Sequence, residues 1–281
     1  MAEVFTLTFG RQGFYFDNGM TMRKIMVLVS MVWTGAGYAQ TADSPAFRPP
    51  DYQQIATETA DAASPYYYPE LMRRYERGDT TLTLEDFRHL YYGYPAQPGY
   101  KPLLASPYAD SLEQAFGKRS RLEAGDYRRV AQFAREILRE EPFSMRDLNV
   151  LAFACQMLDE PEKAAVQMAK IRGILEAIRS TGTGLREESP WYVIYLRDAE
   201  DVLNLLGARF TKFIVVSRSV EYAPVYNMPE GMGKRFRGYY FDYSEVYRRR
   251  PDYLDNLPKP KRRLEVNPLY NPHSKQSVLP K

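Results

Sequence analysis

The sequence predicts an α+β protein that is mostly α-helical, with helical hairpins followed by a small C-terminal antiparallel β-sheet. Apolar residues between positions 51 and 179 recur at the spacing of amphipathic helices. Residues 190–247 instead carry short β-branched and aromatic runs, which are typical of strands. We therefore expect a single α+β domain over residues 51–247, helical over 51–179 and sheet-containing over 190–247.

Before this domain, residues 22–39 have the features of a secretory signal peptide. Arg23 and Lys24 form a cationic start, residues 25–33 form an apolar run, and small residues end at Ala39. The apolar run is shorter than the roughly 20 residues that span a bilayer. We therefore expect an exported protein, periplasmic or secreted, whose mature form has no transmembrane span.

Cleavage is expected between Ala39 and Gln40. Because Gln40 is not a cysteine, the position that a lipoprotein would acylate has no acceptor. Residues 1–21, which precede the signal peptide, are interpreted as the result of a start site assigned too far upstream. Residues 40–50 are short, polar and proline-bearing, so we expect them to form a linker into the domain.

The composition argues against several classes of function. Cys155 is the only cysteine, so no intramolecular disulfide can form, and we expect its side chain to be buried as a small hydrophobe. His89 and His273 are the only histidines, and the usual zinc ligand sets need more histidines and cysteines than the chain has. We therefore expect no metal site and no cofactor.

The positive charge of the chain is concentrated at its C-terminal end. The net charge is +3, but residues 248–281 alone contain nine basic and three acidic residues. The remainder of the chain is therefore net negative, whereas a nucleic-acid-binding protein needs a basic face on its folded body. We expect no nucleic-acid partner, and we expect the basic, proline-containing residues 248–281 to be disordered.

The first three helices are predicted from their caps and apolar faces. Asp51 is placed to cap a helix that ends before the Ser-Pro pair at 64–65. A second helix follows, and Gly78 occupies the position where a glycine commonly ends one. Thr83 and Asp86 have the spacing of a capping box, so a third helix should begin there.

The middle of the chain carries an internal repeat. Residues 125–142 resemble the second helix of a tetratricopeptide repeat, with small and bulky residues at fixed positions before a proline. Advancing by that family's period of about 34 residues carries Val130 onto Ala164, Ala134 onto Met168 and Ile137 onto Ile171. Because a continuous array needs about three repeats, we expect two tetratricopeptide-like hairpins capped by other structure.

The last part of the domain is predicted to form the sheet. One short helix, with Asp198 as its cap and Gly207 as its terminator, separates the first predicted strand from the others. The predicted strands are residues 191–196, 213–216, 239–241 and, as a possible fourth, 220–226.

Three tyrosine-rich stretches resemble a known family. They are residues 64–75 (SPYYYPELMRRY), residues 79–94, which end in YYGY, and the LNLLG at 203–207 together with YYFD at 239–242. The chain resembles the domain-of-unknown-function family forty-nine-nineteen, which is found among exported proteins of Bacteroidetes. That family has no assigned activity, so the resemblance implies no catalytic residues.

Two tyrosine clusters and one histidine make up the candidate surface for a ligand or partner. Tyrosine is unusually abundant, with 23 residues, and an exposed ring offers a stacking surface. His89 is the only histidine within the predicted domain, and Asp86 lies one helical turn before it, where it could orient the ring. The candidate residues are Tyr66, Tyr67, His89, Tyr91, Tyr92 and Tyr94.

Three functions remain open from the sequence. The first is a non-catalytic protein–protein interaction module, in which the helical pairs present a groove to a peptide or an envelope protein. The second is a glycan or small-ligand binder that uses exposed members of the tyrosine clusters, and the third is a hydrolase that uses His89. No nucleophile elbow, phosphate loop or metalloprotease motif marks an enzyme, so we expect a non-catalytic protein.

Overall fold

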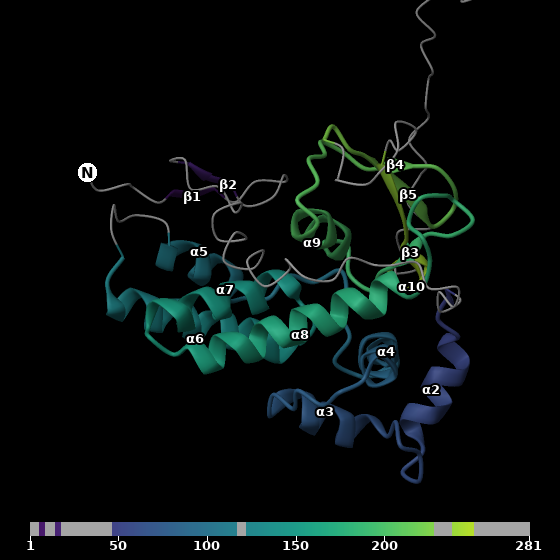
Figure 1. The fold of residues 1–281 in the computed structure, drawn as a ribbon, viewed down its shortest axis with the longest axis horizontal. Helices are drawn as coiled ribbons and strands as arrows, with labels where there is room; N and C mark the ends of the chain where they lie inside the picture. The colour runs from purple at the N-terminus through teal and green to yellow at the C-terminus, as the bar shows by residue number, and fades with distance from the viewer. Residues whose placement is uncertain (1–5, 9–14, 18–46, 117–121, 228–237, 250–281) are drawn as a thin grey trace, which may run out of the picture. The chain divides into compact units, whose positions relative to one another are not determined.

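The computed structural model describes most of the predicted domain (Figure 1). The described residues are 6–8, 15–17, 47–116, 122–227 and 238–249. In the first two ranges, strand β1 (Thr6–Thr8) pairs antiparallel with β2 (Tyr15–Asp17). The expectations for the signal peptide and for residues 250–281 lie outside the described residues.

Three helices open the domain, and their ends follow the predicted caps. Helix α2 (Tyr52–Ala60) begins where the Asp51 side chain accepts a hydrogen bond from a backbone N–H of its first turn. Helix α3 (Tyr68–Glu76) is followed by Gly78, whose φ of 76° is in the left-handed region that favours glycine. The Thr83–Asp86 capping box starts α4 (Leu84–Gly93), and the 3-10 turn η1 (Tyr94–Ala96) follows it.

Four further helices form successive hairpins. They are α5 (Ala109–Phe116), α6 (Ala124–Glu140), α7 (Met145–Met157) and α8 (Pro161–Arg179). Each packs against the next along the chain, and α6, α7 and α8 lie side by side in Figure 1. Five of the six interior positions expected from the repeat register are buried, and the sixth, Met168, is half-buried. The five are Val130, Ala134, Ile137, Ala164 and Ile171. No described helix is long and apolar enough to cross a bilayer.

The C-terminal part forms a four-stranded sheet that is mixed rather than wholly antiparallel. Its strands are β3 (Trp191–Tyr192), β4 (Ile214–Val215), β5 (Val220–Pro224) and β6 (Gly238–Asp242), in the order β3-β6-β5-β4. The pairs β4–β5 and β5–β6 are antiparallel, but β3 runs parallel to β6. A parallel pair needs a crossover connection, which here includes α9 (Asp198–Leu205) and the other two strands. The fold class is confirmed as α+β and mostly helical, whereas the all-antiparallel sheet was wrong.

Contacts with the domain extend beyond both of its predicted ends. Within the predicted linker (40–50), the Arg48 N–H donates to the Ser180 carbonyl at 3.0 Å. At the other end, a short helix, α10 (Ser244–Arg248), follows β6. The Arg249 guanidinium donates to a carbonyl of the turn after α4. The segment predicted as a tail, 248–281, therefore begins with two residues that belong to the fold.

Buried apolar side chains form two clusters, and two helices contribute to both. The larger cluster joins α2, α3 and α4 to the sheet, and the smaller one lies among α5, α6, α7 and α8. The first half of α7 packs in the larger cluster and its second half in the smaller one, whereas α8 does the reverse. Cys155 is 1% exposed within the smaller cluster, so its predicted burial is confirmed.

Two glycines allow the start of the domain to approach α8 closely. A Cβ atom at Gly173 of α8 would lie 2.2 Å from the Phe87 ring of α4. Likewise, a Cβ atom at Gly78 would lie 2.5 Å from Val166 of α8. Any larger residue at these two positions would therefore push the helices apart.

We expect Gly173→Ala to lower the free energy of unfolding by about 1–3 kcal/mol, because the added methyl group overpacks a filled core. Urea denaturation of the wild type and the variant measures the difference. Gly125→Ala is the matched control, since Gly125 lies in α6 and a Cβ there would meet nothing within 4 Å. That control should be neutral or stabilising. Equal stability of Gly173→Ala and the wild type would contradict the close contact.

Candidate functional site

Three of the five candidate tyrosines are part of the core. Tyr91, Tyr92 and Tyr94 are 0%, 1% and 7% exposed. Their hydroxyls have partners inside the protein. Tyr92 donates to the Tyr192 carbonyl at 3.1 Å, and Tyr94 donates to the Glu140 carbonyl at 2.9 Å. The expectation that these three rings form a stacking surface was therefore wrong, because the second half of α4 and the start of η1 are buried.

The hydroxyl of Tyr91 lies at the centre of a hydrogen-bond network that connects α4 with the segment leading into α9. It donates to the Asp198 carboxylate at 2.5 Å and accepts from the Ile194 N–H at 3.2 Å. The Tyr195 N–H donates to the same carboxylate oxygen at 3.0 Å, and the Tyr100 hydroxyl donates to the Ile194 carbonyl at 2.5 Å. Asp198 was predicted to cap α9. Its carboxylate instead accepts hydrogen bonds from the Tyr91 hydroxyl and the Tyr195 N–H, and Arg197 occupies the N-cap position.

Several carboxyl groups near this network are buried. Burial raises the pKa of Asp198 to about 7 and that of Asp147 to about 6. Close by, the Arg146 guanidinium donates to Asp201 at 2.9 Å. Buried acids with raised pKa values are also found in catalytic sites. Asp198, however, is 0% exposed, so a substrate cannot reach it, and its titration acts on stability.

His89 is held in a tight cluster between α4 and α2. Tyr66 stacks on its ring, with centroids 3.6 Å apart and planes 4° from parallel. The ring nitrogen Nδ1 faces the Glu85 carbonyl at 2.8 Å, and Nε2 faces the Glu58 carboxylate at 2.7 Å. Both ring nitrogens are therefore occupied by oxygen partners within this cluster. Neither nitrogen is free to take a proton from a nucleophile.

Asp86 does not orient His89, as the sequence suggested. Its carboxylate accepts from the Thr83 N–H and hydroxyl, at 2.8 and 2.9 Å, within the capping box of α4. Tyr67 is half-buried and lies just before the first residue of α3. The structure therefore brings Tyr66 and His89 together but places Tyr67, Tyr91, Tyr92 and Tyr94 elsewhere. Among the described residues, no group of three or more His, Cys, Asp or Glu side chains is arranged to hold a metal ion.

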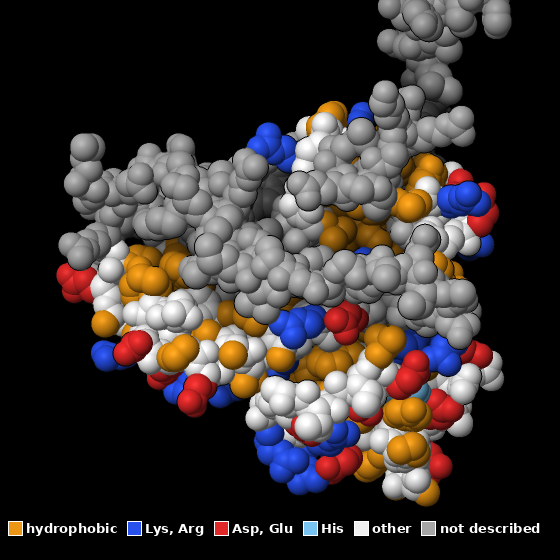
Figure 2. Space-filling model, in the orientation of Figure 1, with side chains coloured by type: hydrophobic (Ala, Val, Ile, Leu, Met, Phe, Trp, Pro, Cys, Tyr) orange, Lys and Arg blue, Asp and Glu red, His pale blue; other side chains and the backbone are white. Residues whose placement is uncertain are grey.

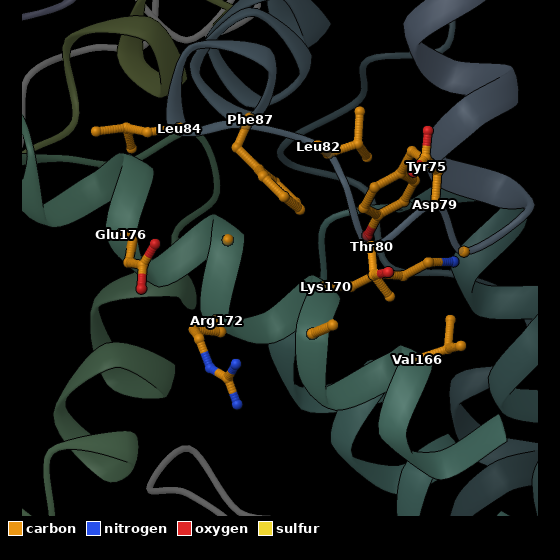
Figure 3. A pocket seen from close by; sticks show the side chains of 13 residues that line it. Tyr75, Asp79, Thr80, Leu82, Leu84, Phe87, Val166, Lys170, Arg172 and Glu176 are labelled. Carbon is orange, nitrogen blue, oxygen red and sulfur yellow. The ribbon is translucent and has the colours of Figure 1, made fainter. Parts of the chain in front are cut away.

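A groove that the sequence did not indicate lies between α8 and the turn from α3 to α4 (Figure 3). It has a volume of about 140 Å³. Figure 3 shows side chains of the α3–α4 segment facing side chains of α8 across the cavity. Both close-approach glycines line it, so glycines at these two positions were the available signal. The lining residues are Tyr75, Gly78, Asp79, Thr80, Leu82, Leu84, Phe87, Val166, Ala169, Lys170, Arg172, Gly173 and Glu176.

Lys170 gives the groove a partly buried positive charge. Its ammonium lies 4.5 Å from the centre of the Tyr75 ring, in a cation–π contact. Burial lowers the pKa of Lys170, and the described residues offer its ammonium no ion pair within 4 Å. Arg172 and Glu176 are exposed on the same helix, and Figure 2 shows apolar side chains among charged ones over α6 and α8. The groove thus places the Lys170 cation beside apolar side chains such as Val166 and Leu82.

Comparison with known families identifies the family of this chain. The model of a domain of unknown function, DUF4919, matches residues 53–250, which is most of the chain. The chain belongs to the DUF4919 family. The matched DUF4919 region contains the groove, the Tyr91 network and the His89 cluster. No curated protein and no solved structure matches the chain.

We expect the stability of the DUF4919 domain to fall between about pH 4 and pH 7 through Asp198. The pKa of this group rises from 3.8 to about 7 on folding, so the folded state binds more protons across that window. The contribution is complete below about pH 4 and is lost as the pH rises through about 7. Each unit of pKa difference corresponds to about 1.4 kcal/mol.

Urea denaturation of the wild type and Asp198→Asn, measured at a series of pH values, tests this. The asparagine cannot ionise, so the variant should lack this part of the decline. Asp147→Asn is the companion variant, and its effect should end near pH 6, because the pKa of Asp147 is raised only to about 6. Curves that run parallel from pH 4 to pH 7 for wild type and Asp198→Asn would rule the idea out.

Proposed function

We propose that this DUF4919 protein is an exported, periplasmic and non-catalytic interaction module. In this proposal the helices α5 to α8 act as tetratricopeptide-like pairs, and an extended segment of an envelope protein or peptide binds in the groove beside α8. The observation that carries the proposal is the groove itself, with its apolar side chains and the cation of Lys170.

The size of the groove favours a peptide over a small ligand. Small-molecule sites usually occupy about 300–1,000 Å³, and this groove has about 140 Å³. That volume suits one or two anchoring side chains of a longer segment, the rest of which lies on the surface. Among the described residues the ammonium of Lys170 has no ion pair within 4 Å, which favours a carboxylate next to the apolar anchor, since an ion pair offsets the cost of its partial burial.

The two alternative functions, a glycan or small-ligand binder and a hydrolase, have less support. A glycan or small-ligand binder would need exposed tyrosines, but Tyr91, Tyr92 and Tyr94 lie in the core. A hydrolase would need a free nitrogen on His89, but both nitrogens face oxygen acceptors. The groove depends on neither set of residues.

Ala169→Trp should abolish peptide binding, because Ala169 lines the groove and an indole ring would fill it. A displayed peptide library, selected on the full protein, should yield sequences with an aliphatic residue beside an acidic one. Ala165→Trp is the matched control on the same helix, since Ala165 is exposed and lies outside the groove lining. Selected peptides that bind all three proteins equally would overturn the proposal.

The proposed export has a separate test. When the full-length gene is expressed in a host with a periplasm, the protein should be released by osmotic shock, and its N-terminal sequence should begin at Gln40. Replacing Arg23 and Lys24 with glutamate should retain the protein in the cytoplasm, because the signal peptide would lose its cationic start. An unprocessed protein that stays in the cytoplasm would contradict export.

A further inference from the structure

Strand β4 forms one edge of the described sheet and carries exposed apolar side chains. It is the outermost strand in the order β3-β6-β5-β4, and no described strand pairs with its outer side. Ile214, Val215 and Val216 are 39%, 67% and 40% exposed. Sheet edges are commonly protected by short strand length, charges, prolines or bulges. β4 is short, with two residues, but Ile214, Val215 and Val216 include neither a charge nor a proline.

The backbone of β4 is oriented to receive another strand. Ile214 pairs with Tyr222, and the Val216 N–H donates to the Val220 carbonyl at 3.0 Å. In an antiparallel ladder, residues alternate between pairs that exchange hydrogen bonds and pairs that do not. Val215 lies between these two bonded positions, so its N–H and C=O point away from β5. The free edge therefore offers a donor and an acceptor beside exposed aliphatic side chains.

Positive charges flank this edge. The sequence from 207 to 220 contains three basic residues and no acidic one. Arg209, Lys212 and Arg218 are exposed, and the described part of the chain provides none of them with an ion pair. An apolar centre between cations is complementary to a segment whose own apolar centre lies between carboxylates.

We propose that the β4 edge binds an extended peptide segment with β-branched residues at its centre and acidic residues at its flanks, as an added strand. The backbone of Val215 would supply ladder hydrogen bonds, and Lys212 and Arg218 would pair with the flanking carboxylates. This surface is separate from the groove beside α8, so the inference does not depend on the proposed function.

Charge argues against two other occupants of the edge. Antiparallel self-pairing centred on Val215 would place Lys212 opposite Arg218 of the second copy, and like charges across a strand pair are destabilising. The chain's own residues 248–281 carry nine basic and three acidic residues, so they would meet the same repulsion. An acidic-flanked segment from another protein avoids both conflicts.

The test uses fluorescent synthetic peptides and the full-length protein. The probe peptide has alternating valine and threonine between aspartates, and the control peptide has lysines in place of the aspartates. We expect fluorescence anisotropy to show at least about tenfold tighter binding of the aspartate peptide, which corresponds to about 1.4 kcal/mol. The double variant Lys212→Glu, Arg218→Glu should reverse that preference, and both substituted side chains are exposed in the wild type.

Val215→Pro provides the backbone test. Proline removes the outward N–H without removing a bond to β5, so the variant should fold, as judged by circular dichroism, and lose the aspartate peptide. If Val215→Pro fails to fold, the peptide preference of the Lys212→Glu, Arg218→Glu variant is the deciding measurement. Equal binding of both peptides, no binding, or a preference unchanged by charge reversal would overturn the proposal. Concentration-dependent dimerisation that Val215→Pro abolishes would also overturn it, because the edge would then belong to a second copy.

Discussion

The hydrogen bond between the Tyr91 hydroxyl and the Asp198 carboxylate is the interaction on which the architecture depends. It joins residues that are 107 positions apart and connects the first helices to the start of the C-terminal sheet region. Burying a carboxylate is costly unless hydrogen bonds compensate for lost water. Tyr91 and the Tyr195 N–H offset part of that cost at one carboxylate oxygen, and the two parts of the domain share one large apolar cluster around it.

The abundance of tyrosine follows from the same constraint. A domain that buries irregular backbone between its helices and its sheet leaves carbonyl groups without partners in regular structure. Tyr75, Tyr92, Tyr94 and Tyr100 each place a ring in the apolar cluster and donate a hydroxyl to such a carbonyl. These tyrosines therefore stabilise the interior of the domain. The surfaces that we propose for partners are the groove and the β4 edge.

The sequence was sufficient where the signal is local. Asp51, the Thr83–Asp86 pair and Gly78 act within one turn of the chain, and each works as predicted. Tertiary features could not be predicted in this way. Burial of Tyr91 depends on what packs around α4, and the parallel β3–β6 pair depends on the path of the chain through α9. The groove is lined by two glycines whose neighbours lie far away in the sequence, and no local motif marks it.

The sharing of α7 and α8 between the two apolar clusters has a consequence for local opening. Each of these helices has buried side chains in both clusters. Unfolding of either cluster would therefore remove packing contacts from half of α7 and half of α8. Amide hydrogens along α7 and α8 should then exchange with solvent only in the rarest, largest openings, and the helix pair should behave as a single cooperative unit. Cutting the domain into a helical repeat fragment and a sheet fragment would divide that unit.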